Sequence, residues 1–285
     1  MRLCRFNDDR LGVVEGETIR DVSEALAVLP KVGWPAPLGD QLVANLPRIR
    51  QEIERLAPQA RALALGDAIL RSPVANPSKI IGAPINYKDH IEESKKDPGI
   101  AHGRVIKAIG DWGLFLKANS ALVGAGDGVA LRFPDRRNDH EVELALVIGR
   151  AGADIRREAA LDHVAGYAIG LDMTVRGPEL PSFRKSVDSY AVLGPWLVTA
   201  EEVSDPDALD FELRVNGEVR QKSNTRHLDY DVRRLIEYAS SFYTLLPGDI
   251  IMTGTPAGVG PVKPGDTMSV AMERIGAMTV RVRAA

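Results

Sequence analysis

The sequence lacks the features that mark secreted, membrane-spanning and nucleic-acid-binding proteins. Cys4 is the only cysteine in 285 residues, so no disulfide forms within the chain and a reducing compartment is expected. The longest stretch without charge, Ile250 to Val262, has 13 residues with three glycines and two prolines, whereas a membrane span needs about 20 apolar residues. The 36 Lys and Arg residues face 39 Asp and Glu residues, so no basic excess draws the chain to nucleic acid or to a membrane.

The composition that is present is that of a globular protein. Hydrophobic residues make up 45% and charged residues 26%, which excludes a disordered chain. The first ten residues contain no apolar segment, so we expect no secretory signal and a cytoplasmic location. Short β-rich runs up to Val22 and a helix around Ile49 to Leu56 predict a small N-terminal α+β domain, residues 1–75. The two prolines between Ser72 and Lys79 are its predicted boundary.

The remaining residues, 76–285, predict a β-dominated domain of the α+β class. Asn216-Gly217 lies between two alternating runs and indicates a hairpin. One helix is expected from Asp229 to Tyr243, with Asp229 as its N-cap, and a shorter one near Glu158 to His163. The dense turn signals between short apolar runs favour helices packed outside a curved or closed sheet.

Two glutamates at the start of one apolar run form the strongest local signal. Glu141 and Glu143 lie on the same face of a predicted strand, roughly 6.6 Å apart along it. An exposed acidic strand face explains such a pair in many proteins. Here, however, apolar residues continue on both faces up to Ile148, which indicates a strand buried on both sides. Because buried carboxylates without a positive partner are very costly, the pattern favours a divalent cation at this end of the strand.

A third carboxylate and a histidine–glutamate pair are further candidate functional residues. Asp172 ends another apolar run and fits the same site, although a turn or helix-capping aspartate is an equally good interpretation. His90 and Glu93 are three residues apart and become neighbours if the segment is helical. A carboxylate that orients a neutral imidazole makes a general base for water, whereas the alternative is an exposed helical pair.

The basic residues that follow Asp172 leave two interpretations open. Arg176 and Lys185 either hold an acidic substrate beside a metal or belong to the charged surface. The glycine-rich stretch Thr253 to Gly260 lacks the Gly-Lys-Ser/Thr ending of a phosphate-binding loop. No nucleophile elbow, Cys-x-x-Cys pair or His-Glu-x-x-His motif is present either. An enzyme with this sequence is therefore expected to use activated water.

In order along the chain, six motifs together resemble the fumarylacetoacetate hydrolase family, in its bacterial acylpyruvate hydrolase and 2-hydroxyhepta-2,4-diene-1,7-dioate isomerase-like branch. The matching stretches are IIGAPINYKDHIEE, DHEVELALVIGR, GYAIGLDMTVRG, RKSVDSYAVLGPWLV, LRVNGEVRQKSNT and LLPGDIIMTGTPAGVG. The resemblance covers Lys79 to the C-terminus and implies a mixed β-sandwich roll or barrel with peripheral helices. It also implies a bound Mg²⁺ or Mn²⁺, or alternatively Ca²⁺, and a homodimer.

The resemblance also assigns roles to individual residues. Metal ligands are implied at Glu141, Glu143 and Asp172, and the water-activating dyad at His90 and Glu93. Lys185 matches the catalytic lysine beside the metal. Substrate-binding positions are implied at Tyr87, Arg176, Glu179, Ser189 and Thr255. The charged segment from Glu92 to Lys107 is expected to form a lid over the pocket.

One position departs from the family pattern. Many members follow the arginine as Arg-Asp-x-Gln, whereas this chain reads Arg176-Gly177-Pro178-Glu179. The carboxylate of Glu179 would repel a substrate carboxylate unless it is protonated or paired.

The function that the resemblance implies is metal-dependent hydrolysis of a C–C bond in a 2,4-diketo acid of the acylpyruvate or fumarylpyruvate type. The cation would lower the energy of the enolate that leaves, while the dyad activates water. Two alternatives remain open. One is a lyase or isomerase acting on a related 2-oxo acid, such as an oxaloacetate decarboxylase or a 2-oxo-dienoate hydratase. The other is a ligand-binding protein without catalysis.

Overall fold

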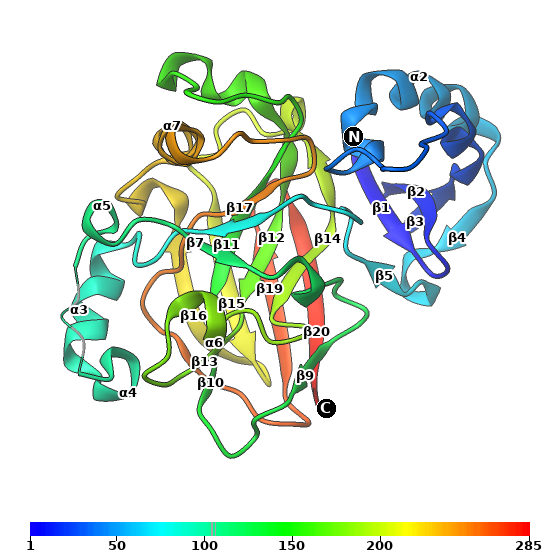
Figure 1. Ribbon diagram of the computed structural model, residues 1–285. Coiled ribbons are helices and arrows are strands. Elements are labelled where there is room, and N and C mark those ends of the chain that lie inside the picture. The colour runs from blue at the N-terminus through cyan, green and yellow to red at the C-terminus, as the bar shows by residue number, and fades with distance from the viewer. Residues whose placement is uncertain (104, 106) are drawn as a thin grey trace.

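A large twisted sheet runs through the whole molecule (Figure 1). The computed structural model describes residues 1–103, 105 and 107–285. In spatial order, the main path of this sheet is β4 (Ala62–Ala64), β3 (Thr18–Asp21), β2 (Arg10–Glu15), β1 (Arg2–Phe6), β14 (Ala191–Thr199), β12 (Val164–Asp172), β11 (Val142–Ile148), β17 (Ile250–Met252), β6 (Ile80–Gly82) and β7 (Phe115–Lys117). Off this path, β5 (Leu70–Arg71) pairs with β1 and β8 (Leu122–Val123) with β14.

Two smaller sheets complete the β-structure of the described residues. The first contains β13 (Thr174–Val175), β10 (Asn138–His140) and β18 (Gly260–Pro261). The second contains β16 (Glu218–Asn224), β15 (Asp210–Val215), β19 (Thr267–Met272), β20 (Gly276–Ala284) and β9 (Val129–Leu131). The predicted β-dominated α+β class is confirmed. Each strand order runs from one edge strand to another, so the sheets are open, and the closed barrel among our expectations is wrong for the described part of the chain.

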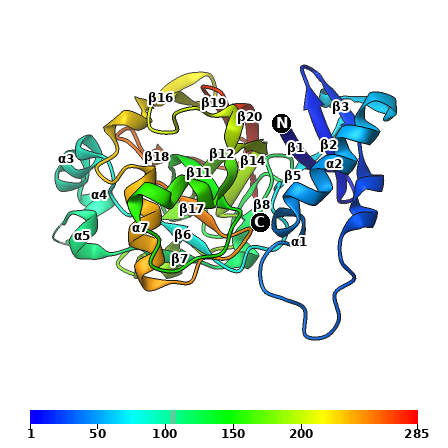
Figure 2. The ribbon, with the colours of Figure 1, turned by 90° about the horizontal axis from the view of Figure 1, so that it is seen from above.

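The helices are short and lie at the periphery (Figure 2). The α-helices are α1 (Gln41–Ala44), α2 (Leu46–Leu56), α3 (Lys88–Lys96), α4 (Pro98–Ala101), α5 (Ile109–Trp112), α6 (Pro181–Arg184) and α7 (Val232–Phe242). The 3₁₀ helices are η1 (Ser23–Val28), η2 (Ala57–Gln59), η3 (Leu65–Asp67), η4 (Asn119–Ala121), η5 (Arg157–His163), η6 (Ala200–Glu202) and η7 (Thr225–His227). No helix of the described residues is both long enough and apolar enough to cross a bilayer.

Local sequence signals predicted several elements and misplaced one cap. The hairpin at Asn216-Gly217 joins β15 and β16, as expected. The segment near Glu158 to His163 is helical, but as a 3₁₀ helix. Asp229 is not the N-cap of α7. That position belongs to Asp231, whose Oδ1 accepts a hydrogen bond from Arg234 N at 2.9 Å, because the helix begins at Val232, the first residue of its buried apolar face.

The N-terminal segment is joined to the rest of the molecule through sheet pairing and shared core. It lies at the side opposite α3, α4 and α5 in both views (Figures 1 and 2). Strand β1 pairs with β14, with Leu3 opposite Leu197. Leu3 and Ile53 belong to the same buried cluster as Ala145 and Val147 of the central strand β11. The division of the chain at residue 75 remains a prediction.

Strand β11 is buried along its whole length, as its sequence predicts. Its even-numbered side chains, Val142, Leu144, Leu146 and Ile148, pack into one hydrophobic cluster. Ala145 and Val147 point to the opposite face and pack into a second cluster. Glu143 therefore shares a face with apolar side chains at the end of a fully covered strand, which is the arrangement expected of a functional carboxylate.

Candidate metal centre and active site

Three carboxylates converge where β11 begins and β12 ends. Glu143 lies on β11, and Glu141 occupies the break between β10 and β11 rather than a continuous strand. The antiparallel register places Asp172 beside this break, where its main-chain N donates to Glu141 O at 2.9 Å. One oxygen from each carboxylate lies within 4.8 Å of the others, and all three residues are buried. The structure thus brings together the three predicted metal ligands.

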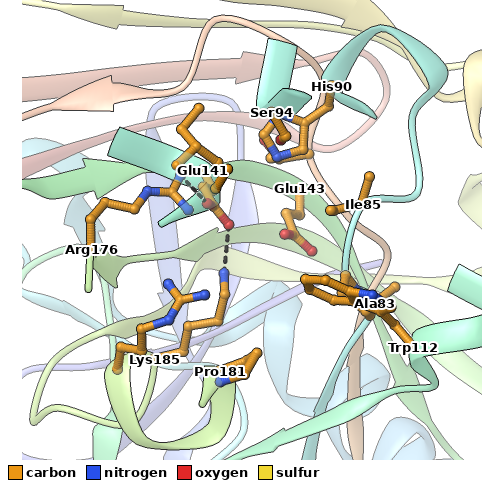
Figure 3. A pocket seen from close by; sticks show the side chains of 15 residues that line it. Ala83, Ile85, His90, Ser94, Trp112, Glu141, Glu143, Arg176, Pro181 and Lys185 are labelled. Atoms are coloured by element: carbon orange, nitrogen blue, oxygen red, sulfur yellow. Dashed lines mark hydrogen bonds and ion pairs between the residues drawn. The ribbon is translucent and has the colours of Figure 1, made fainter. Parts of the chain in front are cut away.

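Three buried cations surround this triad. Lys185 Nζ donates to Glu141 Oε2 and to Asp172 Oδ2, each at 2.6 Å. Arg176 Nη2 donates to Glu141 Oε1 at 2.7 Å (Figure 3). Lys117 forms a short ion pair with Asp172. Lys117 was missed by our sequence reasoning, because a single lysine at the end of the short strand β7 carries no motif that marks it.

Burial and neighbouring charges drive the carboxyl pKa values in opposite directions. Burial acts to raise the pKa of Glu141, but Lys185 and Arg176 outweigh it and hold that pKa well below its usual range. Burial raises the pKa of Glu143 well above its usual value, and the nearby charge of Asp172 raises it further. Glu143 Oε2 accepts one hydrogen bond, from Gly254 N at 2.6 Å. A negative charge on Glu143 is therefore poorly compensated by the protein itself.

This donor set fits a hard divalent cation. Carboxylate oxygens are the ligands that Mg²⁺, Mn²⁺ and Ca²⁺ prefer. A divalent charge beside Glu143 would favour the ionised form that burial opposes. Lys185, Arg176 and Lys117 already hold Glu141 and Asp172 in fixed orientations, as the surroundings of a metal site generally do. Glu141, Glu143 and Asp172 are therefore the residues that would hold the cation. We call the three carboxylates and these three cations the metal end of the cavity.

His90 and Glu93 form the predicted dyad on α3. His90 Nδ1 lies 2.8 Å from Glu93 Oε2, and the histidine side chain is buried. Glu93 Oε1 also accepts from Gly258 N at 2.9 Å, which ties α3 to the loop after β17. His90 lines the same cavity as Glu141 and Glu143, with its ring on the side of the two glutamates away from Lys185 (Figure 3). Because Nδ1 faces Glu93, Nε2 is the nitrogen available to a molecule in the cavity.

Short helices supply the wall on another side of the cavity. Ile100 and Ala101 come from α4, Trp112 from α5, and Pro181 and Arg184 from α6. We call these five residues the helical wall. Our sequence reasoning missed all of them, since such short helices show no apolar period. The predicted lid, 92–107, contains the end of α3 and all of α4, while residues 104 and 106 lie outside the described residues.

A strained residue also lines the cavity. Ile85 has φ of 49°, in the left-handed region that β-branched residues rarely adopt, at a cost of about 1–3 kcal/mol. The next residue, Asn86, holds this conformation: its side-chain Nδ2 donates to Tyr230 O and Thr253 O, each at 2.8 Å. Ile85 was also missed by our sequence reasoning, since nothing in its residue type indicates a positive φ.

The predicted substrate-binding residues divide into two groups. Arg176 and Thr255 line the cavity, and Gln221 Nε2 donates to Thr255 Oγ1 at 2.7 Å. Tyr87, Glu179 and Ser189 are not among the residues that line it. Tyr87 is fully buried against Phe211, with ring centroids 6.4 Å apart, and Ser189 Oγ accepts from Ala130 N at 2.8 Å. Both residues support the fold around the cavity.

Comparison with known proteins decides the family. Residues 79–283 match the family model "Fumarylacetoacetate (FAA) hydrolase C-terminal". The chain belongs to the fumarylacetoacetate hydrolase family. A maleylpyruvate hydrolase of Aquipseudomonas alcaligenes is 56% identical, and the match covers 99% of both chains. A 2,4-didehydro-3-deoxy-L-rhamnonate hydrolase of Sphingomonas sp. (strain SKA58) is 33% identical over 99% of this chain and 96% of its own length.

Solved structures of the family share the fold over the full length. The crystal structure of maleylpyruvate hydrolase from Sphingobium sp. SYK-6, in complex with a manganese(II) ion and pyruvate, superposes with a TM-score of 0.84. Its sequence is 42% identical to this chain, and the match covers 100% of both chains. The manganese and the pyruvate are properties of that relative.

Glu179, which departs from the family pattern, forms an ion pair with Arg136. Arg136 Nη1 and Nη2 donate to the two carboxylate oxygens of Glu179 at 3.0 and 2.8 Å. The Arg136 side chain is chiefly responsible for lowering the pKa of Glu179, which is therefore an anion near neutral pH. The positive charge of Arg136 thus offsets the repulsion between Glu179 and a substrate carboxylate that the sequence suggested.

Proposed function

We propose that this protein is a divalent-metal-dependent hydrolase that cleaves the C–C bond between C3 and C4 of an acylpyruvate, with maleylpyruvate as the first substrate to test. The relatives named maleylpyruvate hydrolase support this reaction class. The observation that carries the proposal is the position of His90, which lines the same cavity as Glu141 and Glu143, two of the three carboxylates that would hold the cation. A water molecule between His90 and these glutamates would have a base on one side and the substrate on the other.

Glu141, Glu143 and Asp172 would hold the cation. Bound there, a cation of charge +2 would stabilise the negative charge that develops on the substrate. Mn²⁺ and Mg²⁺ are the first candidates and Ca²⁺ the third, because all three prefer carboxylate oxygens.

His90 acts as the general base. Its Nε2 takes a proton from water, and the resulting hydroxide attacks the C4 carbonyl carbon. Glu93, which faces Nδ1 at 2.8 Å, stabilises the imidazolium that forms. The C3–C4 bond then breaks, and its electron pair passes to C3 as the enolate of pyruvate. The proton that His90 took from water is delivered to C3, which gives pyruvate and restores neutral His90, and C4 leaves as the new carboxylic acid.

Lys185 and Arg176 place positive charge beside the reacting groups. The pKa of Lys185 is raised: burial acts to lower it, but Asp172 and Glu141 outweigh burial. Lys185 is therefore an ammonium that stabilises developing negative charge at the metal end. Arg176 Nε donates to Asp139 Oδ2 at 2.7 Å, which orients its guanidinium toward Glu141. The hydrogen bond from Gln221 Nε2 to Thr255 Oγ1 likewise fixes the orientation of the Thr255 side chain, which lines the cavity.

Metal removal followed by product analysis tests the proposed reaction. EDTA-treated protein is assayed on maleylpyruvate with and without Mn²⁺ or Mg²⁺, and products are identified by mass. We expect no turnover without metal and equimolar pyruvate and maleate with it. Turnover that persists in EDTA would contradict the proposal. So would release of carbon dioxide from oxaloacetate as the principal activity.

The assembly and location of the protein are part of the same proposal. We infer a homodimer in the cytoplasm, from the family resemblance and from the single cysteine, whose burial raises its thiol pKa to about 12. Light scattering on the purified protein tests the dimer. A monomeric mass for fully active protein would contradict it.

A further inference from the structure

A buried serine on α3 lines the cavity without a hydrogen-bond partner. Ser94 is fully buried, and its Oγ bonds to no atom of the described residues. A serine inside a helix usually donates to the carbonyl four residues earlier, which here is His90 O, but Ser94 does not make that bond. A buried hydroxyl without a partner is unfavourable, and such groups are rare in folded proteins. The hydroxyl of Ser94 is therefore available to a molecule bound in the cavity.

Ser94 lies beside the proposed general base. His90 and Ser94 are four residues apart on α3, so their side chains share one face of the helix. Figure 3 shows them next to each other, both on the side of Glu141 and Glu143 away from Lys185. In the proposed reaction, Nε2 of His90 takes a proton from the water that attacks C4. Ser94 therefore lies on the side of the cavity where C4 and its oxygen are attacked.

The other hydroxyl of the described cavity lining, that of Thr255, already has partners. Its Oγ1 donates to Val142 O at 2.8 Å and accepts from Gln221 Nε2 at 2.7 Å. Main-chain groups fix the orientation of the Gln221 amide: Oε1 accepts from Val142 N at 3.1 Å, and Nε2 donates to Pro256 O at 3.0 Å. The hydroxyl hydrogen of Thr255 is thus engaged, whereas the described residues offer no acceptor to that of Ser94.

We propose that Ser94 Oγ donates a hydrogen bond to the oxygen on C4 and stabilises the oxyanion that forms there when water attacks. As the new C4–O bond forms, the π electron pair of the C4 carbonyl moves to this oxygen, and it returns as the C3–C4 bond breaks. Ser94 keeps its proton throughout. A donor placed in advance where charge develops stabilises the transition state more than the substrate. This inference rests on the proposed hydrolysis and adds a catalytic residue to which the family resemblance assigns no role.

Removal of the hydroxyl tests the assignment. In Ser94→Ala, kcat on maleylpyruvate should fall about 100-fold, since one oxyanion donor contributes about 10²–10³-fold. KM and the Mn²⁺ dissociation constant should stay within about 3-fold of wild type. The melting temperature should not fall, because the substitution removes a buried hydroxyl without a partner and introduces a strong helix former. Assays at saturating Mn²⁺ and scanning calorimetry measure these quantities.

Ser240→Ala is the matched control. Ser240 is also a buried serine in a helix, α7, and it does not line the cavity. Its Oγ donates to Glu237 O at 3.0 Å and accepts from Ile155 N at 2.9 Å. Loss of these two bonds should lower the melting temperature and leave kcat within about 2-fold of wild type. The two serine variants should therefore show opposite patterns of activity and stability.

Two ligands that the enzyme does not hydrolyse test the contact to the oxyanion directly. In 3-(methylphosphinato)pyruvate, a phosphinate replaces the C4 carbonyl and places a negative oxygen where the oxyanion forms. 2-Oxopentanoate has the same chain length but no oxygen on C4. In calorimetric titrations of the Mn²⁺-loaded proteins, Ser94→Ala should bind the phosphinate at least about 10-fold more weakly than wild type, because hydrogen bonds to charged oxygens are strong. Its affinity for 2-oxopentanoate should change less than about 2-fold.

The outcomes separate the two proposals. If wild type hydrolyses maleylpyruvate and Ser94→Ala keeps kcat within about 3-fold, the inference is overturned and the proposed reaction stands. An equal loss of affinity for both ligands, or a melting temperature more than about 3 °C below wild type, would give Ser94 a structural role and overturn the inference. A lower kcat with unchanged phosphinate affinity would overturn it as well. If wild type hydrolyses no acylpyruvate but its phosphinate affinity depends on Ser94, the proposed reaction fails and the oxyanion contact stands.

Discussion

The metal end and the helical wall of the same cavity are built from different kinds of structure. Strands β7, β11 and β12, with the break before β11, place Lys117 and the three carboxylates. Sheet register and ion pairs fix these side chains together. The helical wall comes from α4, α5 and α6, which have four residues each. The sheet thus fixes the carboxylates and the cations around them, whereas three short helices supply another wall of the same cavity.

Replacing a carboxylate at the metal end should have the largest effect. Glu143→Gln keeps the size of the side chain but removes a negative ligand from the triad. We expect the Mn²⁺ dissociation constant to rise more than about 100-fold and turnover at micromolar metal to be lost. Calorimetric Mn²⁺ titration measures the first effect. If Mn²⁺ still binds Glu143→Gln with wild-type affinity, the ion lies elsewhere.

Removing the base should separate chemistry from metal binding. In His90→Gln, kcat should fall about 1,000-fold, since a positioned general base contributes 10²–10⁴-fold. The Mn²⁺ affinity should stay within about 3-fold of wild type, because His90 is not among the three residues of the carboxylate triad. Stopped-flow or discontinuous assays with saturating Mn²⁺ measure kcat. Full activity of this variant would remove the dyad from the mechanism.

A change in the helical wall should weaken substrate binding and leave the metal end intact. Trp112→Ala removes the largest apolar side chain of the helical wall. We expect KM for maleylpyruvate to rise about 10-fold through lost contact area, with Mn²⁺ affinity unchanged. Steady-state kinetics beside a metal titration check this. A loss of Mn²⁺ affinity in Trp112→Ala would show that the two regions are not independent.

The smallest effect is expected at Glu179, outside the cavity lining. Glu179→Gln restores the amide that many family members carry and weakens the pair with Arg136. Both side chains are partly exposed, at 33% and 28%, and such a pair contributes about 0–1 kcal/mol to stability. We expect kcat/KM on maleylpyruvate to change less than about 3-fold. A change of 100-fold would place Glu179 in the substrate site.

The carboxylates of the metal end could be predicted from the sequence, whereas Lys117 and the helical wall could not. Glu141 and Glu143 interrupt an apolar strand, and a buried carboxylate needs a positive partner, so the pattern itself points to a cation. Lys117 eluded prediction because its partner, Asp172, lies 55 residues away and only the sheet brings them together. The positive φ of Ile85 and the position of Arg184 also depend on tertiary contacts that residue type does not encode.

The most direct test of this account is anomalous diffraction at the manganese edge from crystals soaked in Mn²⁺. The account predicts one strong peak with oxygens of Glu141, Glu143 and Asp172 as its protein ligands. A peak elsewhere, or no peak among these carboxylates at saturating Mn²⁺, would contradict it.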